Sequence, residues 1–371
     1  MTRAFYIDRL RVFLTILVIF HHSAIAFGAS GGWYYVSNET THGITQMILT
    51  LFMAIDQAYF MSFFFFISAI LMPDSYERKG FGKFLKDRLV RLGIPLLVYI
   101  LLLHPTLVFA IHRYLGKPTG TWYEFVWGII TRHAHPGPMW FVLTLLIFEM
   151  LYAFNRHFTK QGYVLKKAGK LPTARGIIGF MIVTGAAAFC IRLVYPTGKS
   201  FFGLQFGFFP LYIGMYLLGI TANRNNWLER LTVKNARPWF IVSLLAIPIL
   251  IVAVMVSQSP GAMNSFSGGI NYRALTYAIW EPLVCVGFCY FFLLYFKKHF
   301  NSPNKLILAL SGDTYTAYII HPLVVVGCTF LSEQIVMPPL ARLGFVLITA
   351  IPTCFFIAWL IRKVPGIKKV L

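Results

Sequence analysis

Long apolar stretches, separated by short polar segments rich in Lys and Arg, fill almost the whole chain. A helix needs about 20 apolar residues to cross a bilayer, and most of these stretches have that length. They show no clear helical periodicity, so length and flanking charge set their ends. The predicted membrane helices cover residues 12–28, 46–72, 90–111, 139–155, 176–195, 204–222, 239–257, 274–296, 314–331 and 343–361. The sequence predicts an all-α membrane protein, a polytopic bundle of about ten transmembrane helices.

The basic residues are distributed unevenly between alternate loops. If the N-terminus is cytoplasmic, 26 of the 33 Lys and Arg fall on the cytoplasmic side. The segments concerned are residues 3–11, 78–91, 156–175, 224–237, 297–305 and 362–369. Cytoplasmic loops of membrane proteins carry an excess of Lys and Arg. We therefore predict that both termini are cytoplasmic, which also requires an even number of spans.

Composition favours one membrane domain with little sequence outside the bilayer. Hydrophobic residues make up 58% of the chain and charged residues 12%, against roughly 25% charged residues in a soluble domain. We expect a single domain over 1–371 and no separate soluble domain. The net charge of +21 can indicate nucleic-acid binding. Here the basic clusters lie between apolar stretches, which indicates a lipid bilayer as partner and no nucleic acid.

The first apolar stretch has a second interpretation. A basic start, an apolar run and Ala24-Ile25-Ala26 also describe a cleavable signal peptide. Cleavage would remove the most chemically suggestive residues of the chain and would leave an odd number of spans. We therefore favour retention of this stretch as the first membrane helix.

Two ionisable residues lie on that first predicted helix. Arg11 and His22 are eleven positions apart, which is about 16 Å along a helix axis and close to three turns, so both lie on one face. Arg11 would lie at the cytoplasmic boundary and His22 past the middle of the bilayer. Ionisable groups at that depth are rare and often functional, and neutral imidazole is the form that a general base requires. A His hydrogen-bonded to a neighbouring helix is an equal alternative, and the adjacent His21 could share or take over the role.

Arg88 and Arg91 mark the cytoplasmic start of the third predicted helix. Residues three apart lie on one face of an α-helix, where two guanidiniums can bind phosphate groups. The alternative is ordinary anchoring of a helix end by basic residues. When this pair of arginines is considered alone, that alternative is favoured.

Other ionisable residues lie within later predicted helices. A carboxylate in hydrocarbon must pair, be protonated or line a wet cavity, so Glu149 and Glu281 could each orient a His or pair with an Arg. His321, followed by Pro322, raises the same question, together with Asp313 in the same segment. Catalytic and structural roles stay open for these four ionisable residues.

No metal centre is expected. The chain contains neither CxxC nor HExxH, and its five Cys lie in apolar stretches, as is typical of core residues. His133 and His135 lack an indicated third ligand. Residues 28–32 match G-x-S-x-G, but the strand and turn that present a nucleophilic Ser are missing from the pattern.

Four segments, taken in order, resemble the acyltransferase 3 family of integral membrane O-acyltransferases. Members of that family open with a basic residue, ten intervening positions and a His, as residues 11–22 do. Residues 88–92 resemble the R-x-x-R-L segment of the family, and residues 137–141 its W-F segment. Residues 315–322 resemble its late Y-x-x-H-P element.

The resemblance implies a ten-helix protein of the bacterial inner membrane. It implies transfer of an acyl group from cytoplasmic acyl-CoA, such as acetyl-CoA or succinyl-CoA, to a hydroxyl of an extracytoplasmic acceptor, commonly a carbohydrate. His22 would be the catalytic His and Arg11 its motif partner, and Arg88 and Arg91 would lie near the CoA phosphates. The Trp-Glu-Pro element that contains Glu281 is similar to the periplasmic-glucan-modifying, succinyltransferase-like branch, so Glu281 joins the catalytic candidates.

Two questions of mechanism stay open at this point. We expect direct transfer, with His22 removing the proton of the acceptor hydroxyl as it attacks the thioester, although a covalent acyl-enzyme is the other possible route. The main functional alternative is a proton-coupled transporter or a lipid or glycan flippase, because intramembrane His, Glu and Arg also form proton relays. Many transporters have internal repeats, and none is visible in this sequence.

Overall fold

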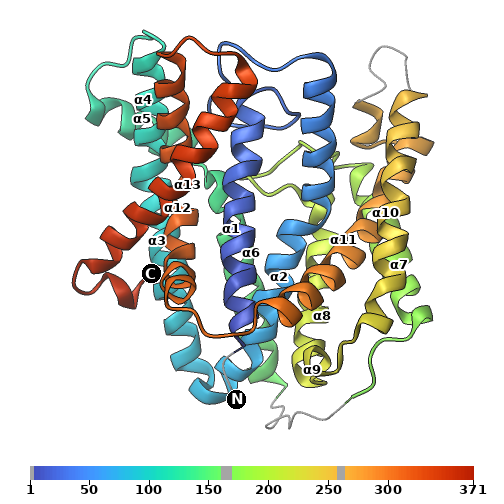
Figure 1. Cartoon of the computed structure of the whole chain (residues 1–371). Helices are drawn as coiled ribbons and strands as arrows, with labels where there is room; N and C mark the ends of the chain where they lie inside the picture. Colours follow the sequence, from blue (N-terminus) through green and yellow to red (C-terminus); the bar gives the residue numbers. More distant parts are fainter. Residues whose placement is uncertain (1–3, 160–168, 257–263) are drawn as a thin grey trace. The chain divides into compact units, whose positions relative to one another are not determined.

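The computed structural model describes residues 4–159, 169–256 and 264–371, and these residues form helices and loops without a β-strand (Figure 1). The α-helices are α1 (Phe5–Ala26), α2 (Gly43–Arg88), α3 (Ile94–Val98), α4 (His104–Tyr114), α5 (Trp122–His133), α6 (Trp140–Phe158), α7 (Ala174–Arg192), α8 (Phe209–Arg224), α9 (Trp227–Arg230), α10 (Val233–Met255), α11 (Tyr272–His299), α12 (Lys305–Glu333) and α13 (Pro339–Lys363). Some residues used in the predictions lie outside the described residues. These are four basic residues counted as cytoplasmic, Arg3, Lys160, Lys166 and Lys167, and residue 257, at the end of one predicted span.

Nine helical segments of the described chain are long and apolar enough to cross a membrane. Every predicted span overlaps one of them, and the segment Gly43–Tyr114 contains both 46–72 and 90–111. Between these two spans, Gly80 has a φ of 70°, a left-handed conformation that interrupts an α-helix and that glycine adopts without strain. The all-α membrane class is thus confirmed, with about nine segments instead of ten because one helical run joins two predicted spans. The orientation of the termini stays a prediction.

The chain divides into two compact units, each of which is described by itself. Unit 1 comprises Met1–Leu10, Ala54–Phe81 and Asn155–Pro303. Unit 2 comprises Arg11–Met53, Gly82–Phe154 and Asn304–Leu371. The single domain expected over 1–371 stays a prediction.

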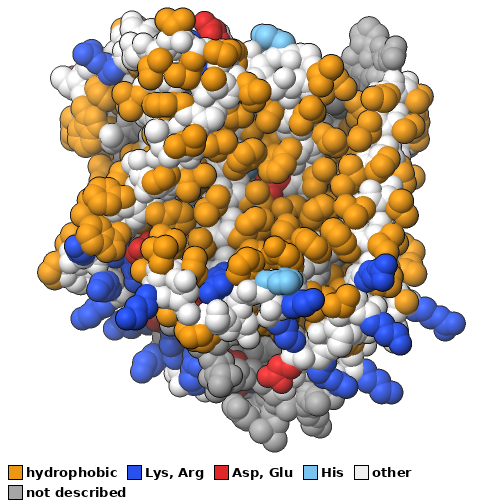
Figure 2. Space-filling view, in the orientation of Figure 1, with side chains coloured by type: hydrophobic (Ala, Val, Ile, Leu, Met, Phe, Trp, Pro, Cys, Tyr) orange, Lys and Arg blue, Asp and Glu red, His pale blue; other side chains and the backbone are white. Residues whose placement is uncertain are grey.

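In unit 1, α10 and α11 pack closely through small residues and interhelical hydrogen bonds. The indole N–H of Trp280 donates to the carbonyl of Ala246 at 2.8 Å, and the hydroxyl of Ser243 donates to that of Leu283 at 2.7 Å. A side chain at Gly287 would collide with Ser243. Such contacts hold helices together where lipid removes the hydrophobic driving force. Only 17% of the most apolar 18-residue stretch of α10 is buried, and hydrophobic side chains cover much of the molecular face that Figure 2 shows.

In unit 2, α12 and α13 run side by side and the segment before α2 folds against them (Figure 1). The buried side chains of Tyr35, Leu107, Ile111 and Val326 form a core between that segment, α4 and α12. Unit 2 also includes the part of α1 that carries His21 and His22. This core therefore fixes the loop between α1 and α2 beside α12.

Two prolines explain two π-helical turns, Leu89–Gly93 and Tyr99–Leu103. The N–H groups of Ile94 and His104 reach the carbonyls of Leu89 and Tyr99, five residues back. The next residue in each case is proline, which cannot donate to the carbonyl four residues back. The turn before each proline therefore widens to the π pattern, which occurs often near functional sites.

Candidate functional site

The helix α1 carries His22 on an unbroken run of α-helix. Arg11, eleven residues earlier, lies about 16 Å from His22 along the axis, so the two side chains do not touch. Arg11 is partly buried. Its catalytic partnership with His22 stays a prediction, because other residues surround the imidazole.

The ring of His22 is stacked against two other rings of unit 2, those of Trp33 and His321. The ring centroid of His22 lies 4.1 Å from that of Trp33 and 5.1 Å from that of His321, with interplanar angles of 16° in both cases. The centroids of Trp33 and His321 are 5.9 Å apart. His21 meets His22 edge to face at 5.3 Å. The structure therefore joins His22 with His321 and adds Trp33, and we call these three residues the ring stack.

Each ring of the ring stack has a buried polar atom without a hydrogen-bond partner among the described residues. These atoms are Nδ1 of His22, Nε1 of Trp33 and Nε2 of His321. Leaving a buried donor or acceptor unsatisfied costs about 1–3 kcal/mol. His22 and Trp33 also keep an exposed part, whereas His321 is fully buried. Three such atoms on adjoining rings are typical of a site that a polar molecule completes.

The sequence His321-Pro322 explains the orientation of the His321 ring. Pro322 has no N–H, so it cannot bond the carbonyl of Tyr318 four residues back. That carbonyl instead lies 2.5 Å from Nδ1 of His321. A carbonyl oxygen only accepts hydrogen bonds, so Nδ1 carries the proton and Nε2 carries the lone pair. The proline therefore fixes the tautomer of the histidine before it.

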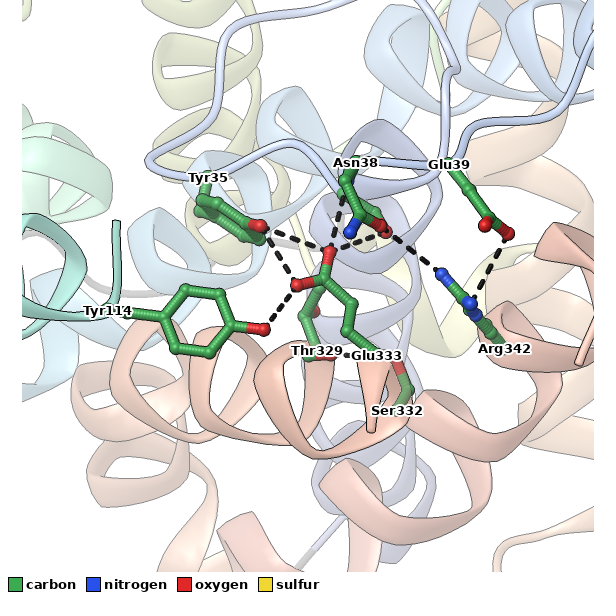
Figure 3. A network of polar contacts seen from close by, with 9 residues as sticks. Tyr35, Asn38, Glu39, Tyr114, Thr329, Ser332, Glu333 and Arg342 are labelled. Atoms are coloured by element: carbon green, nitrogen blue, oxygen red, sulfur yellow. Dashed lines mark hydrogen bonds and ion pairs between the residues drawn. The ribbon is translucent and has the colours of Figure 1, made fainter. Parts of the chain in front are cut away.

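A hydrogen-bonded cluster around Glu333 attaches the loop of Trp33 to the end of α12 (Figure 3). The Glu333 carboxylate accepts hydrogen bonds from the hydroxyls of Tyr35, Ser37 and Tyr114, at 2.9, 2.8 and 2.6 Å. The backbone N–H of Asn38 donates to it at 3.0 Å. Hydrogen bonds to a charged group are about twice as strong as those between neutral groups. We call this cluster the Glu333 strap.

Arg342, at the start of α13, extends the Glu333 strap. Its guanidinium donates to Oδ1 of Asn38 at 3.3 Å and lies 3.3 Å from the Glu39 carboxylate (Figure 3). Burial and the hydrogen bond to Glu333 raise the pKa of Tyr35 above its usual value, so Tyr35 stays protonated as a donor. The loop that carries Trp33 is thus held at several successive positions.

Tyr34 makes a second attachment of the same loop, toward α4. Its hydroxyl lies 2.8 Å from Nδ1 of His104 and 3.0 Å from the hydroxyl of Tyr99. A side chain at Gly137, which has a φ of 50°, would collide with the Tyr34 hydroxyl. The neighbouring Pro138 carbonyl accepts a hydrogen bond from the Tyr318 hydroxyl. The W-F and Y-x-x-H-P segments therefore meet beside the ring stack.

Arg88 and Arg91, the two arginines predicted to be cytoplasmic, have different surroundings. Arg88 Nε lies 3.1 Å from a carboxylate oxygen of Glu149, so Glu149 pairs with an arginine. Arg91 is exposed within the π turn. A π turn holds more residues than an α turn, so Arg88 and Arg91 are further apart around the axis than three α-helical positions would place them. Their role as a phosphate site stays a prediction.

Glu281 and Asp313 each bind an arginine. Glu281, in unit 1, pairs with Arg192, and both side chains are at most 4% exposed. Tyr277 also hydrogen-bonds Glu281. Asp313, in unit 2, lies 2.6 Å from Arg362. These contacts explain the burial of both carboxylates without catalysis, and a catalytic role for Glu281 stays a prediction.

Trp33 and Glu333 are the members of this site that sequence reasoning missed. Trp33 lies in the loop between α1 and α2, and aromatic residues are common near the ends of membrane helices. Glu333 is a single acidic residue at the end of a predicted helix. A signal was present in the run of Trp33, Tyr34 and Tyr35, because three consecutive aromatic residues in a short loop need partners to bury them.

Comparison with known proteins gives two matches. The model of the acyltransferase 3 family, described as an acyltransferase domain, matches residues 5–359. Glucans biosynthesis protein C of Shigella dysenteriae serotype 1 (strain Sd197) is 26% identical over 288 residues, which cover 71% of this chain and 68% of that protein. No solved structure matches the chain. The family model covers almost the whole chain, including all three members of the ring stack, and so the chain belongs to the acyltransferase 3 family of membrane acyltransferases.

Proposed function

We propose that this acyltransferase moves an acetyl or succinyl group from cytoplasmic acyl-CoA to a hydroxyl of an extracytoplasmic carbohydrate, in a bacterial inner membrane. The observation that carries the proposal is the ring stack, an imidazole on a membrane helix with a buried and unsatisfied ring nitrogen. Glucans biosynthesis protein C is named for glucan synthesis, which favours a glucan as acceptor.

The chemical step requires one base and one leaving group. His22 takes the proton of the acceptor hydroxyl, and the oxygen forms a bond with the thioester carbonyl carbon. The carbon–sulfur bond breaks, and the thiolate of CoA receives the proton from His22. The products are an ester and free CoA, and no covalent enzyme intermediate is required.

The donor enters from the basic side in this proposal. Cytoplasmic termini place Arg88 and Arg91 on the side where CoA is found, and guanidiniums bind phosphate through two parallel hydrogen bonds. Because Arg88 already pairs with Glu149, the phosphate competes with a carboxylate for this arginine. Arg91, exposed, is the first contact for an incoming CoA.

The test is thioester consumption by the full chain in nanodiscs, with acetyl-CoA and succinyl-CoA offered together with a mixed glycan pool. We expect CoA release by the wild type and a loss of at least about 100-fold in His22→Ala, the usual range for removal of a general base. His133→Ala is the matched control, because His133 is exposed at the end of α5, and it should keep wild-type activity.

Other results would reject His22 as the base or reject acyl transfer itself. Release that survives His22→Ala would reject His22 as the base and make His21 the next variant. A folded protein that neither binds CoA nor releases it from any donor would reject acyl transfer. Movement of a glycan or lipid without thioester consumption would then establish the transporter or flippase alternative.

A further inference from the structure

His321 presents one nitrogen with a defined hydrogen-bonding character. Its Nδ1 donates to the Tyr318 carbonyl, so Nε2 can only accept. That nitrogen is buried and has no partner among the described residues. The whole side chain is inaccessible to solvent. His321 therefore offers a fixed acceptor, which the proposed proton transfer to His22 does not use.

Trp33 offers the complementary group. The indole nitrogen carries a hydrogen and can only donate, and it too is buried without a partner. The two rings lie 5.9 Å apart between centroids and 19° from parallel. A hydroxyl is the smallest organic group that both accepts and donates, so one hydroxyl can satisfy Trp33 and His321 together.

The stacked arrangement also separates the two imidazoles chemically. Ring nitrogens form hydrogen bonds in the plane of the ring, and the planes of His22 and His321 are 16° from parallel with centroids 5.1 Å apart. Stacked rings cannot share a hydrogen bond, so each imidazole must bind a group outside the pair. In the proposed reaction the attacking hydroxyl gives its proton to His22, so Trp33 and His321 need a second group on the same molecule.

We infer that Trp33 and His321 bind a second hydroxyl of the acceptor, next to the hydroxyl that His22 deprotonates. The inference rests on the proposed acyl transfer and names two positioning residues for it. The acceptor is accordingly a compound with hydroxyls on neighbouring carbons. Trp33 donates to the oxygen of the second hydroxyl, and the hydrogen of that hydroxyl points at Nε2 of His321.

The test compares two acceptors that differ in one hydroxyl, trans-1,2-cyclohexanediol and cyclohexanol, in the full chain in nanodiscs. The second hydroxyl gains two hydrogen bonds and loses its contacts with water, so the wild type should prefer the diol about tenfold in kcat/KM, or about 1.4 kcal/mol, mainly through KM. Trp33→Phe removes the donor and keeps a ring. His321→Asn removes Nε2, and its amide can still donate to the Tyr318 carbonyl. The preference should fall to near one in both variants, because a buried hydroxyl that keeps one partner and lacks the other loses most of the gain, and Trp359→Phe on α13 should keep it.

Thermal denaturation gives a readout that does not depend on turnover. A ligand that binds the folded protein raises its midpoint, so the diol should raise that of the wild type more than cyclohexanol does. The excess should vanish in Trp33→Phe and His321→Asn. An excess that persists in both variants overturns the inference, as does an equal loss of kcat/KM for both acceptors. If no protein releases CoA but the variants lose the excess, the second-hydroxyl site stands and the proposed acyl transfer fails.

Discussion

Two buried polar clusters, one in each unit, differ in whether their polar groups are charged and paired. In unit 1, Arg192 and Glu281 are an ion pair, and Arg192 also donates to a backbone carbonyl at 3.0 Å. In unit 2, the ring stack of His22, Trp33 and His321 keeps three polar atoms without partners. The first cluster pairs full charges, although Nη1 of Arg192 has no hydrogen-bond partner among the described residues. The second cluster carries groups that can stay neutral.

The difference shows how burial can be used for structure or for binding. A buried charge without a partner is strongly destabilising, so a membrane protein retains one only where it is paired. An unsatisfied neutral ring nitrogen costs only about 1–3 kcal/mol, which the rest of a folded unit can offset. Arg192 and Glu281 thus join α7 to α11, whereas the ring stack remains available for a ligand.

The largest predicted effect is loss of the charge pair. Arg192→Met leaves Glu281 buried without its cation and should lower the free energy of unfolding by about 3–5 kcal/mol. The measurement is reversible unfolding in mixed detergent micelles. His22→Ala, which removes no charge pair, should change the same quantity much less.

A double variant sharpens the result. Arg192→Met combined with Glu281→Leu removes both charges and should recover most of the lost stability, as replacement of buried ion pairs often does. Equal instability in the single and double variants would show that the polar contacts of Arg192 with the backbone and rings matter more than its charge.

An intermediate effect is expected from the Glu333 strap. Glu333→Gln replaces a charged acceptor of several hydrogen bonds by a neutral amide and should cost about 2 kcal/mol. The loop of Trp33 loosens, so the KM for the acceptor should rise while CoA binding is unchanged. Kinetics with varied acceptor and donor concentrations separate the two. Wild-type KM values in this variant would mean that the loop is held by Tyr34 and α4 alone.

The smallest effect on stability, with a distinct effect on function, is expected for Pro322→Ala. The restored N–H bonds the Tyr318 carbonyl and competes with His321 Nδ1, so the second tautomer of His321 becomes available. Stability should change by less than about 1 kcal/mol, and kcat/KM for the acceptor should fall about two- to fivefold, because part of the population presents a donor where an acceptor is needed. Pro352→Ala on α13 is the matched control. Unchanged kinetics would show that Pro322 does not set the tautomer.

Apolar length and flanking charge predicted the helices well, because a bilayer imposes both on any spanning segment. The count of nine segments against ten predicted spans arises at Gly80, a non-helical residue across which two helical stretches follow one another without a loop. The sequence did not predict the π turns before Pro95 and Pro105, because a proline alone does not determine how the helix around it rearranges.

For the site, the sequence indicated both His22 and His321 as candidates but did not predict that they lie together. His321 lies 299 positions from His22, and ring contacts over such separations depend on tertiary packing. The pairing of Glu149 with Arg88 was one of two open alternatives, because an acidic residue within a span does not indicate its partner. The position of Trp33 could not be predicted, because it depends on the Glu333 strap, which joins two segments about 300 residues apart along the chain.

The Glu333 strap has a further consequence for binding. His321 and Glu333 belong to the same helix, twelve residues apart, which is about 18 Å along its axis. One helix therefore carries both the ring of His321 and the anchor of the loop that holds Trp33. The same loop is hydrogen-bonded to the end of α1, through the N–H groups of Ser37 and Thr41. The three rings thus belong to one hydrogen-bonded framework, and a site that is ordered before its ligand arrives loses less entropy on binding.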